Sequence, residues 1–386
     1  MLAHNQQDFI RRMPEASHDL RRRRSFWHIV HVDPVLLILL LALTAFGMVV
    51  LYSASGGDGS VIKRQAVFFM IAYIGMFTVA QISVDFFSRW SLLFYVGALG
   101  LLVAVLFFGV GAKGAQRWLS LGGIRFQPSE MMKLAMPIVI AAYLSNKTLP
   151  PRFKHVFWSL ILVVVPTVLI IKQPDLGTSI LVAISGLIVL FYAGLRWRYI
   201  LSAVALLLAS IWPMWHYVLY DYQRRRIITL FDPEADKLGA GWNIIQSKTA
   251  IGSGGLDGKG WLAGTQSHLD FLPEGHTDFI IAVLAEEFGF IGVLALLVLY
   301  LLIIGRGLFI AVNAQDSFRR LLAGSITLTF FVYVFVNIGM VSGLLPVVGV
   351  PLPLVSLGGT SLVTLMLGFG LLMGISTEPP KITNNR

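Results

Sequence analysis

The sequence contains no cysteine and few charged residues. Among 386 residues, Asp, Glu, Lys and Arg make up 13%, against roughly 25% in an ordinary soluble domain. The absence of cysteine excludes disulfides, thiolate metal sites and cysteine nucleophiles. The low charge, combined with 56% hydrophobic residues and a mean hydropathy of +0.77, excludes an ordinary soluble fold.

Motifs of several familiar enzyme classes are also missing. The sequence has no His/Glu spacing typical of zinc hydrolases, no P-loop and no exposed serine nucleophile motif. The net charge of +10 does not indicate nucleic acid binding, because the basic residues lie between apolar segments and form no basic patch or helix. We therefore expect no nucleic acid partner and attribute the charge to membrane topology.

Ten apolar segments are candidates for membrane-spanning helices, which need about 20 mostly apolar residues. They are 35–53, 66–82, 91–110, 131–144, 156–171, 178–194, 199–220, 279–305, 321–341 and 353–375. The fourth is the weakest, because Glu130 and Lys133 lie at its start, and a nine-helix topology is the alternative. The sequence predicts an all-α polytopic membrane protein of about ten transmembrane helices.

The distribution of Lys and Arg predicts the orientation. If the amino terminus is cytoplasmic, most basic residues in short loops and tails lie on the cytoplasmic side, as the positive-inside rule requires. We predict cytoplasmic tails at 1–33 and 377–386 around a transmembrane domain at 34–376. Within this domain, 221–277 forms a large extracytoplasmic loop between the seventh and eighth helices.

Two features of the chain predict structure on the outer side of the bundle. The large loop carries apolar side chains that favour burial, so we expect it to fold partly back into the membrane surface or the mouth of the bundle. These side chains are Trp261, Leu262, Leu269, Phe271 and Leu272. Two segments with proline and glycine, QPDLGT from Gln173 and GLLPVVGVPLPLVSLGGTSL from Gly343, predict tightly turned or re-entrant chain that shapes a cavity.

Asp278 closes the large loop and opens the eighth predicted helix. The helix N-terminus would stabilise its ionised form, and Thr277 or His276 could hydrogen-bond to it. The alternative is an ordinary acidic first-turn residue with Thr277 as the N-cap. Glu286 lies about 80° from Asp278 around the helix axis and could line the same cavity, whereas Glu287 lies opposite and needs a partner within the bundle.

Basic side chains with access to the outer face could bind a pyrophosphate. Arg117, beside Trp118 in a short glycine-rich loop, is the most specific candidate. Lys133 follows Glu130 by three residues, so the two side chains can also simply neutralise each other. The remaining candidates, for which lipid headgroups are the alternative ligand, are Lys113, Arg125, Lys172, Arg224, Arg225, Arg226 and Lys248.

Five stretches resemble, in the same order, the SEDS family of bacterial shape, elongation, division and sporulation proteins. They are RWLSLGGIRFQPSEMMKL from Arg117, QPDLGT from Gln173, YQRRRI from Tyr222, GAGWNIIQSKTAIGSGGLDGKGWLAGTQSHLDFLPEGHTDFIIAVLAEEFGFIG from Gly239, and PLVSLGGTS from Pro353. The resemblance spans nearly the whole membrane domain. The elements at 238–242 and 257–261 look like the elongation branch of the family.

This resemblance implies a ten-helix peptidoglycan glycosyltransferase of the bacterial inner membrane. Such an enzyme joins lipid II disaccharides into glycan strands for cell elongation and rod shape, with its active site facing the periplasm. The implied partners are a class B penicillin-binding protein, which acts as transpeptidase, and other proteins of the elongation machinery.

The same resemblance assigns roles to residues. Asp278 matches the family's catalytic aspartate in the HTDF motif and would take the proton of the attacking sugar hydroxyl. Arg117, Lys133 and the Arg224 to Arg226 run would offset the charge of the leaving lipid pyrophosphate. The residues identify no cofactor, and a divalent cation, Mg²⁺ or Mn²⁺, at the pyrophosphate is the alternative.

The residues by themselves also allow two other functions. In a lipid II flippase or transporter, Asp278 and Glu286 would relay protons or gate a path, and no bond would form. In a non-catalytic scaffold, the protein would only recruit the transpeptidase. Polymer formation from lipid II by the purified protein separates the enzyme from both alternatives.

Overall fold

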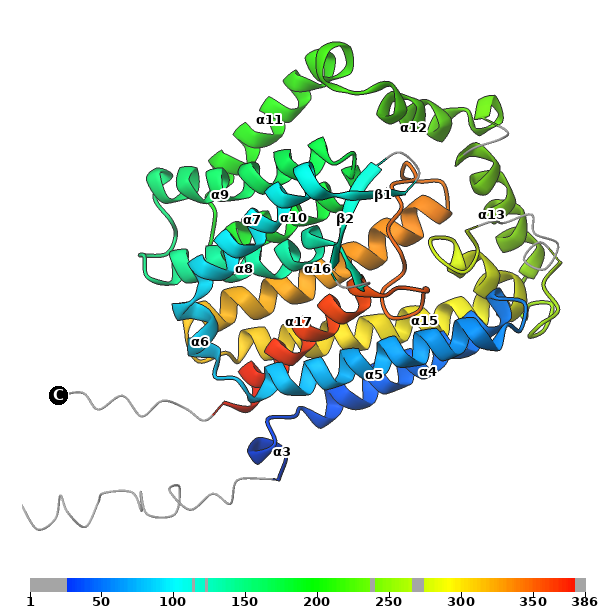
Figure 1. The fold of residues 1–386 in the computed structure, drawn as a ribbon, viewed down its shortest axis with the longest axis horizontal. Coiled ribbons are helices and arrows are strands. Elements are labelled where there is room, and N and C mark those ends of the chain that lie inside the picture. Colours follow the sequence, from blue (N-terminus) through cyan, green and yellow to red (C-terminus); the bar gives the residue numbers. More distant parts are fainter. Residues whose placement is uncertain (1–25, 113–114, 122–123, 237–239, 266–273, 379–386) are drawn as a thin grey trace, which may run out of the picture.

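The computed structural model describes residues 26–112, 115–121, 124–236, 240–265 and 274–378. Within them, each of the ten predicted segments corresponds to a helix (Figure 1). These helices are α4 (Pro34–Ala54), α5 (Gly59–Gln81), α7 (Ser91–Phe108), α8 (Pro128–Ser145), α9 (Phe153–Lys172), α10 (Leu176–Tyr192), α11 (Trp197–Pro213), α15 (Ile280–Val312), α16 (Ser317–Val341) and α17 (Thr360–Thr377). The predicted all-α membrane fold is confirmed, and most of both predicted tails lies outside the described residues.

Eight of these helices are long and apolar enough to span a membrane. Of the other two, α10 is apolar but has 17 residues, and α8 is less apolar because Glu130 and Lys133 lie near its start. Almost all side chains of α8 are buried, among them Met132, Met136 and Ile140. A helix enclosed by protein needs no lipid-facing apolar surface, which explains its weak signal in the sequence.

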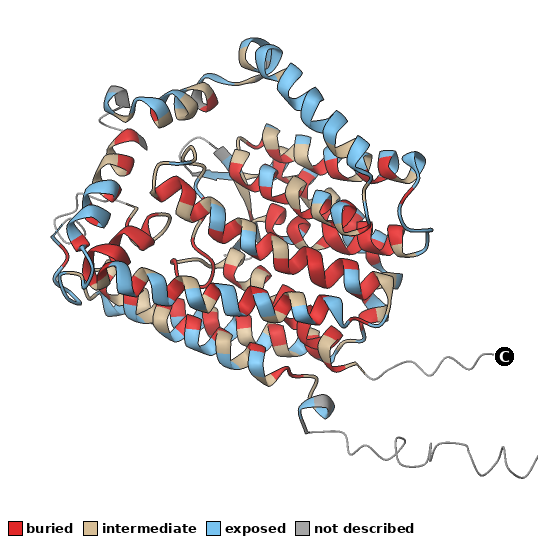
Figure 2. Cartoon of the chain, turned by 180° about the vertical axis from the view of Figure 1, so that it is seen from behind, coloured by how far each residue is buried: buried red, intermediate tan, exposed pale blue. Residues whose placement is uncertain are grey.

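The helices pack around a core that lies where α8, α10, α16 and α17 meet, and Figure 2 shows buried residues concentrated there. The long helices α4, α5, α15 and α17 run side by side (Figure 1). Between α5 and α17 the backbones approach closely at Gly370, where an added Cβ would lie 2.5 Å from the carbonyl oxygen of Met76. Small residues at such positions are what allows helices to pack tightly in a membrane.

Helix α11 stands apart from this bundle. None of its residues is buried (Figure 2), and it continues into a short π-helix, η1 (Met214–Val218). Its exposed side chains are mostly apolar, with Leu206, Leu207 and Leu208 all more than 60% exposed. In a membrane protein such side chains face lipid or another protein.

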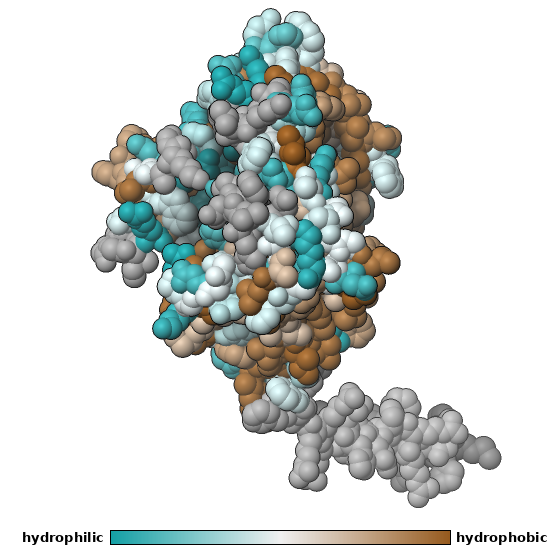
Figure 3. Space-filling model, turned by 90° about the vertical axis from the view of Figure 1, so that its right-hand side faces the viewer, coloured by the Kyte–Doolittle hydropathy of each residue, from teal (hydrophilic) through white to brown (hydrophobic). Residues whose placement is uncertain are grey.

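The predicted large loop is more helical than expected. It contains α12 (Asp221–Phe231), a 3-10 helix η2 (Pro233–Asp236) and α13 (Ala240–Gly254), which form an arch over one side of the bundle (Figure 1). The arch returns to the bundle at α13, where the Ser247 hydroxyl donates a hydrogen bond of 2.9 Å to the carbonyl of Val341 in α16. On this side of the molecule, hydrophilic side chains mix with near-neutral ones, and hydrophobic ones gather along the lower edge (Figure 3).

The structure does not enclose the loop's apolar side chains within the protein where it describes them. Trp261 is 48% exposed and Leu262 is 41% exposed. Trp261 still contacts the bundle, because its indole N–H donates to the carbonyl of Val49 at 3.2 Å and its ring lies 5.8 Å from that of Tyr52. The other three, Leu269, Phe271 and Leu272, lie outside the described residues.

Helix α15 is interrupted at Gly289, whose φ of 63° and ψ of −161° are not helical. A break of this kind leaves backbone groups of the helix without their usual partners. The chain at 255–260 supplies them through four backbone hydrogen bonds of 3.0 to 3.2 Å. These run from Lys259 N to Glu286 O, Gly260 N to Glu287 O, Phe290 N to Gly255 O and Ile291 N to Leu256 O.

Polar contacts tie the helices together at the end opposite this break. Arg319, which is 1% exposed, pairs with Asp85 of α6 (Val84–Arg89), with Asp316 and with Glu378 after α17. Asp33 lies between the short helix α3 (Phe26–Ile29) and α4. Its side chain caps α4 and pairs with Arg306 at 2.7 Å. These contacts join elements that the topology prediction places on the cytoplasmic side.

Candidate active site

A cavity of about 350 Å³ lies at the end of the bundle where α8 and α10 begin. Its wall comes from strand β2, the first turns of α8 and α10, the turn before α15, helix α16 and the irregular chain between α16 and α17. The polar and charged lining residues are Arg117, Gln127, Glu130, Lys133, Asp175, Thr178, Glu274, Thr277, Asp278, Tyr333, Thr360 and Ser361. The proline- and glycine-rich segments after Gln173 and Gly343 thus shape a cavity, as predicted.

Asp278 lies in a turn that directly precedes α15. The N-cap of that helix is Phe279, which makes no side-chain cap hydrogen bond. The Thr277 hydroxyl donates instead to the Glu274 carboxylate, Oγ1 to Oε2, at 2.7 Å. Thr277 is therefore not the helix cap that the alternative reading of Asp278 required, and Asp278 is presented to the cavity from a turn.

The chain between α16 and α17 holds this turn from the other side. The Ser356 hydroxyl donates to the carbonyl of Thr277 at 2.5 Å, and the Leu357 N–H donates to the carbonyl of His276 at 3.0 Å. Gly349 faces the carboxylate, and a Cβ at this position would lie 3.4 Å from Oδ2 of Asp278. Its φ of 75° also favours glycine, so the wall opposite the carboxylate is bare backbone.

Glu130 and Lys133 form a buried pair in the first turns of α8. Lys133 Nζ donates to Glu130 Oε1 at 2.6 Å, and each side chain is 7% exposed. Lys133 also lies 4.8 Å from the ring centroid of Tyr333 in α16. The pair neutralises itself, as the sequence allowed, yet both residues line the cavity.

Arg117 reaches the cavity from an antiparallel sheet that was expected to be a glycine-rich loop. The sheet has the order β1 (Val110–Ala112), β2 (Ala115–Leu121), β3 (Ile124–Phe126). The Arg117 guanidinium donates to the carbonyl of Pro174 and lies 3.9 Å from Asp175. Asp175 caps α10 by accepting from Thr178 N at 3.2 Å, and it accepts from Gln127 Nε2 at 2.8 Å.

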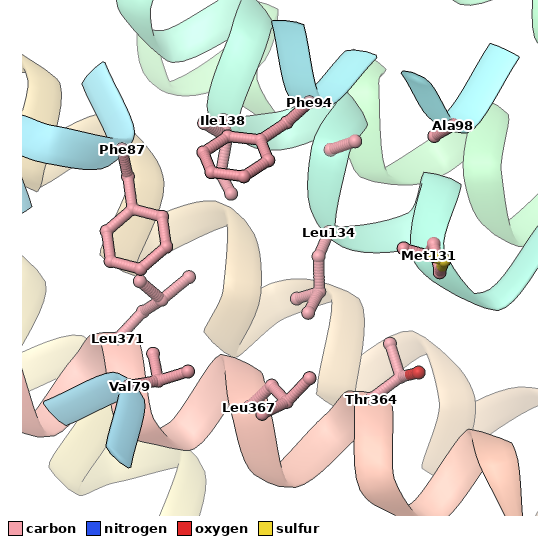
Figure 4. A pocket seen from close by; sticks show the side chains of 11 residues that line it. Val79, Phe87, Phe94, Ala98, Met131, Leu134, Ile138, Thr364, Leu367 and Leu371 are labelled. Atoms are coloured by element: carbon pink, nitrogen blue, oxygen red, sulfur yellow. The ribbon is translucent and has the colours of Figure 1, made fainter. Parts of the chain in front are cut away.

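An apolar groove of about 170 Å³ lies on the other side of α8. Figure 4 shows the side chains that line it, which come from α5, α6, α7, α8 and α17. Met131 and Leu134 face this groove, whereas Glu130 and Lys133, on the same two turns of α8, face the cavity. The groove and the polar cavity are therefore neighbours separated by one helix.

The FtsW/RodA/SpoVE family of cell cycle proteins matches residues 34–381. This chain belongs to that family. The peptidoglycan glycosyltransferase MrdB of Escherichia coli K12 is 54% identical over 93% of this chain and 97% of its own length. A probable peptidoglycan glycosyltransferase FtsW of Trichlorobacter lovleyi is 38% identical over 92% and 95% of the two chains.

Solved structures of family members share the fold. A chain from a peptidoglycan synthase complex, described for its structural coordination of polymerization and crosslinking, covers 89% of this chain and 97% of itself with a TM-score of 0.79 and 31% identity. The rod shape determining protein RodA of Thermus thermophilus covers 89% and 96% with a TM-score of 0.68 and 29% identity. The predicted membership in this family is confirmed.

Of the residues that family resemblance and chemistry singled out, five line the cavity: Arg117, Glu130, Lys133, Thr277 and Asp278. The others are absent from its described lining. Arg224 pairs with Asp221 on α12 at 3.7 Å and donates to the carbonyl of His216, and α12 also carries Arg225 and Arg226. Lys248 lies on α13 against Gly343, and His276 contributes its backbone carbonyl to the turn.

The prediction that Glu286 shares the cavity with Asp278 is wrong. Its carboxylate is fully buried and accepts from Lys259 Nζ at 2.8 Å, Thr265 N at 2.8 Å and Thr265 Oγ1 at 3.0 Å. The chain before Thr265 folds over this face of α15 and closes it off from the cavity. The bundle partner expected for Glu287 is present, because Ser53 Oγ donates to its Oε1 at 2.5 Å.

Seven polar lining residues were not singled out from the sequence: Gln127, Asp175, Thr178, Glu274, Tyr333, Thr360 and Ser361. Asp175 lies in the QPDLGT segment, which was predicted to shape a cavity without a role for this side chain, and Glu274 lies four residues before Asp278. Tyr333 gives no sequence signal, since one tyrosine in an apolar helix is ordinary. Among the described residues, no three His, Asp or Glu side chains come together as metal ligands.

Proposed function

We propose that this protein polymerises lipid II into peptidoglycan glycan strands, with Asp278 as the general base. The activity class rests on membership in the FtsW/RodA/SpoVE family and on relatives at 54% identity that are named peptidoglycan glycosyltransferases. The observation that carries the residue assignment is the position of Asp278, which lines the same cavity as two basic groups, Arg117 and Lys133.

The reaction needs a proton acceptor beside a stabiliser of negative charge. A hydroxyl of the acceptor sugar attacks the anomeric carbon of the donor, the bond from that carbon to the lipid pyrophosphate breaks, and the hydroxyl proton passes to Asp278. The leaving pyrophosphate gains negative charge as the bond breaks. Arg117 and Lys133 are preorganised to offset it, because neighbouring protein groups already fix both side chains.

The apolar groove beside the cavity is the proposed binding site for the lipid part of the substrate. A lipid-linked sugar has a polar head and a long hydrocarbon chain, and α8 separates a polar cavity from an apolar groove within two helical turns. The head can enter the cavity while the first units of the chain lie along Met131, Leu134 and Leu367.

The predicted topology places the cavity on the periplasmic face of the inner membrane and both termini in the cytoplasm. The polar contacts around Arg319 and Asp33 lie together at the opposite end, in agreement with this orientation. The similarity to a chain from a peptidoglycan synthase complex supports a membrane complex. A class B penicillin-binding protein is the proposed transpeptidase partner, with further elongation proteins around the pair.

The test is glycan polymerisation from purified lipid II, with and without the transpeptidase. We expect Asp278→Asn to lose at least about 10²-fold in rate, the scale of general base catalysis. Asp257→Asn, in an exposed turn, is the matched control and is expected to keep the parent rate. Equal rates for parent and Asp278→Asn would remove Asp278 as the base.

Two further arms of this experiment separate the alternatives. Chelation with EDTA stops the reaction only if a divalent cation bridges the pyrophosphate. If the parent makes no polymer even with its partner but moves lipid II between the leaflets of a liposome, the protein is a flippase and the glycosyltransferase assignment fails.

A further inference from the structure

Asn337 is a fully buried polar residue on α16 beneath the cavity. Its side-chain Nδ2 donates two hydrogen bonds, to the carbonyl of Asp278 at 2.9 Å and to the carbonyl of Val350 at 2.7 Å. Because both partners are carbonyl oxygens, only the NH₂ group of the amide can satisfy them. Its Oδ1 has no hydrogen-bond partner within the described part of the chain, so the amide acts here as a double donor.

These two hydrogen bonds join helix α16 to the chain that follows it, 13 residues further on, and to the Asp278 turn, which is 59 residues away in the sequence. One partner is the residue that carries the reactive carboxylate, and the other belongs to the wall opposite it, where Gly349 and Val350 line the cavity. Asn337 itself lies on a continuous helix of 25 residues. The amide therefore connects both sides of the cavity to the same rigid element.

The other hydrogen bonds to the Asp278 turn have a different origin. Ser356 and the backbone of Leu357 hold the carbonyls of Thr277 and His276, but both donors belong to the irregular chain between α16 and α17. If that chain shifts, the turn can shift with it. In the described chain, two side chains donate to the backbone carbonyls of residues 276–278, namely those of Ser356 and Asn337. Ser356 belongs to the irregular chain, whereas Asn337 belongs to a helix.

We propose that Asn337 is a positioning residue, which sets the distance of the Asp278 carboxylate from the facing wall of the cavity. This role rests on the proposed function of Asp278 as the base. Proton transfer needs the acceptor within hydrogen-bond reach of the attacking hydroxyl, and a displacement of about 1 Å can cost about 10²-fold in rate. Replacing Asn337 should therefore slow the chemical step and leave substrate binding unchanged, because Asn337 does not line the cavity and cannot touch substrate.

The experiment compares Asn337→Leu, which fills the space and removes both donors, with Asn337→Ser, which keeps one hydroxyl donor. For the leucine variant we expect the saturated polymerisation rate to fall about 10²-fold and the KM for lipid II to stay within about threefold. The serine variant is expected to fall between this variant and the parent. Should the leucine variant fail to fold, the serine variant with its intermediate rate carries the test.

Ser325→Ala is the matched control. Ser325 lies on the same helix, is equally buried, and donates to the carbonyl of Ser185 at 2.8 Å away from the cavity. It should keep the parent rate within about twofold, as expected for a buried side-chain hydrogen bond remote from the chemistry.

Two results would overturn the positioning role. One is a folded Asn337→Ser variant with the full parent rate, and the other is a rate loss accompanied by an equal rise in KM. Asp278→Asn is assayed in parallel, so that the two proposals fail separately. If Asp278→Asn is inactive while Asn337→Leu is fully active, only the positioning role fails, whereas an active Asp278→Asn contradicts the base assignment itself.

Discussion

Lys133 and Glu130 form a buried pair whose structural contribution can be separated from its proposed role in the chemistry. The pair is 7% exposed and joined by a 2.6 Å contact, so removing one partner leaves the other charge buried without compensation. Such a loss typically costs about 3 to 5 kcal/mol of folding free energy. The cavity nevertheless needs the positive charge of Lys133, if that charge stabilises a leaving pyrophosphate.

A double substitution separates these two contributions. We expect Lys133→Met to unfold at a markedly lower temperature than the parent and to be inactive. Adding Glu130→Gln removes the unpaired charge, so thermal stability should return while polymerisation stays absent. The measurements are the melting temperature in detergent and the polymer yield from lipid II. Recovery of activity in the double variant would show that Lys133 has only a structural role.

The two glutamates of α15 show which residue-level predictions hold. Helical geometry correctly separates the sides on which Glu286 and Glu287 lie, and both find polar partners. The same geometry could not show that residues 259–265 cover Glu286, since that contact joins parts of the chain whose distance depends on the loop fold.

At the scale of single elements, α15 has the most unusual construction. Its break at Gly289 is completed by the chain at 255–260, which supplies the missing backbone hydrogen bonds. An added Cβ at Gly289 would contact the backbone of Gly258 and Leu256, and an added Cβ at Gly258 would meet the carbonyl of Glu287. Backbone of this conformation is essentially restricted to glycine.

Gly289→Ala is therefore expected to destabilise the protein by more than about 2 kcal/mol, from strain and from loss of the loop contact. Gly305→Ala is the control on the same helix, since nothing lies within 4 Å of its added Cβ. The control should be neutral or slightly stabilising, because alanine is the better helix former. Thermal unfolding of the two variants gives the answer, and equal melting temperatures would mean that the break tolerates a side chain.

Element prediction succeeded where the chain faces lipid and weakened where it faces protein. The spans α4, α7 and α9 follow directly from apolar length. Helix α8 gave the weakest signal because it carries Glu130 and Lys133 near its start. These polar residues are tolerated since the surrounding protein buries them. The sheet that carries Arg117 was missed because its strands of three to seven residues are too short for a clear alternation.

At the scale of the whole molecule, the structure separates two chemically different ends. The cavity with Asp278 lies at one end, and the ion pairs of Arg319 and Asp33 lie at the other. The positive-inside rule predicts that the end with the cavity faces the periplasm and that the end with the ion pairs faces the cytoplasm.

The absence of cysteine makes this orientation directly testable, since single cysteines can be introduced without background. Asp257→Cys, in the exposed turn after α13, should react with a membrane-impermeant maleimide in cells whose outer membrane alone is opened. Lys147→Cys, exposed between α8 and α9, should react only after the inner membrane is opened. The reverse pattern would invert the topology, and the cysteine-free parent is the control for unspecific labelling.

The sequence by itself determined the membrane fold, the ten helices and the family, and it singled out Asp278 as the candidate base, because apolar length and ordered motifs are local properties of the chain. Only the tertiary structure decided which polar residues meet. It brought Arg117, Asp175, Lys133 and Asp278 to one cavity, excluded Glu286 from it and placed the Asn337 amide beneath it. These contacts depend on how helices and loops that are far apart in the sequence pack against each other. No local sequence pattern encodes the distances between their side chains.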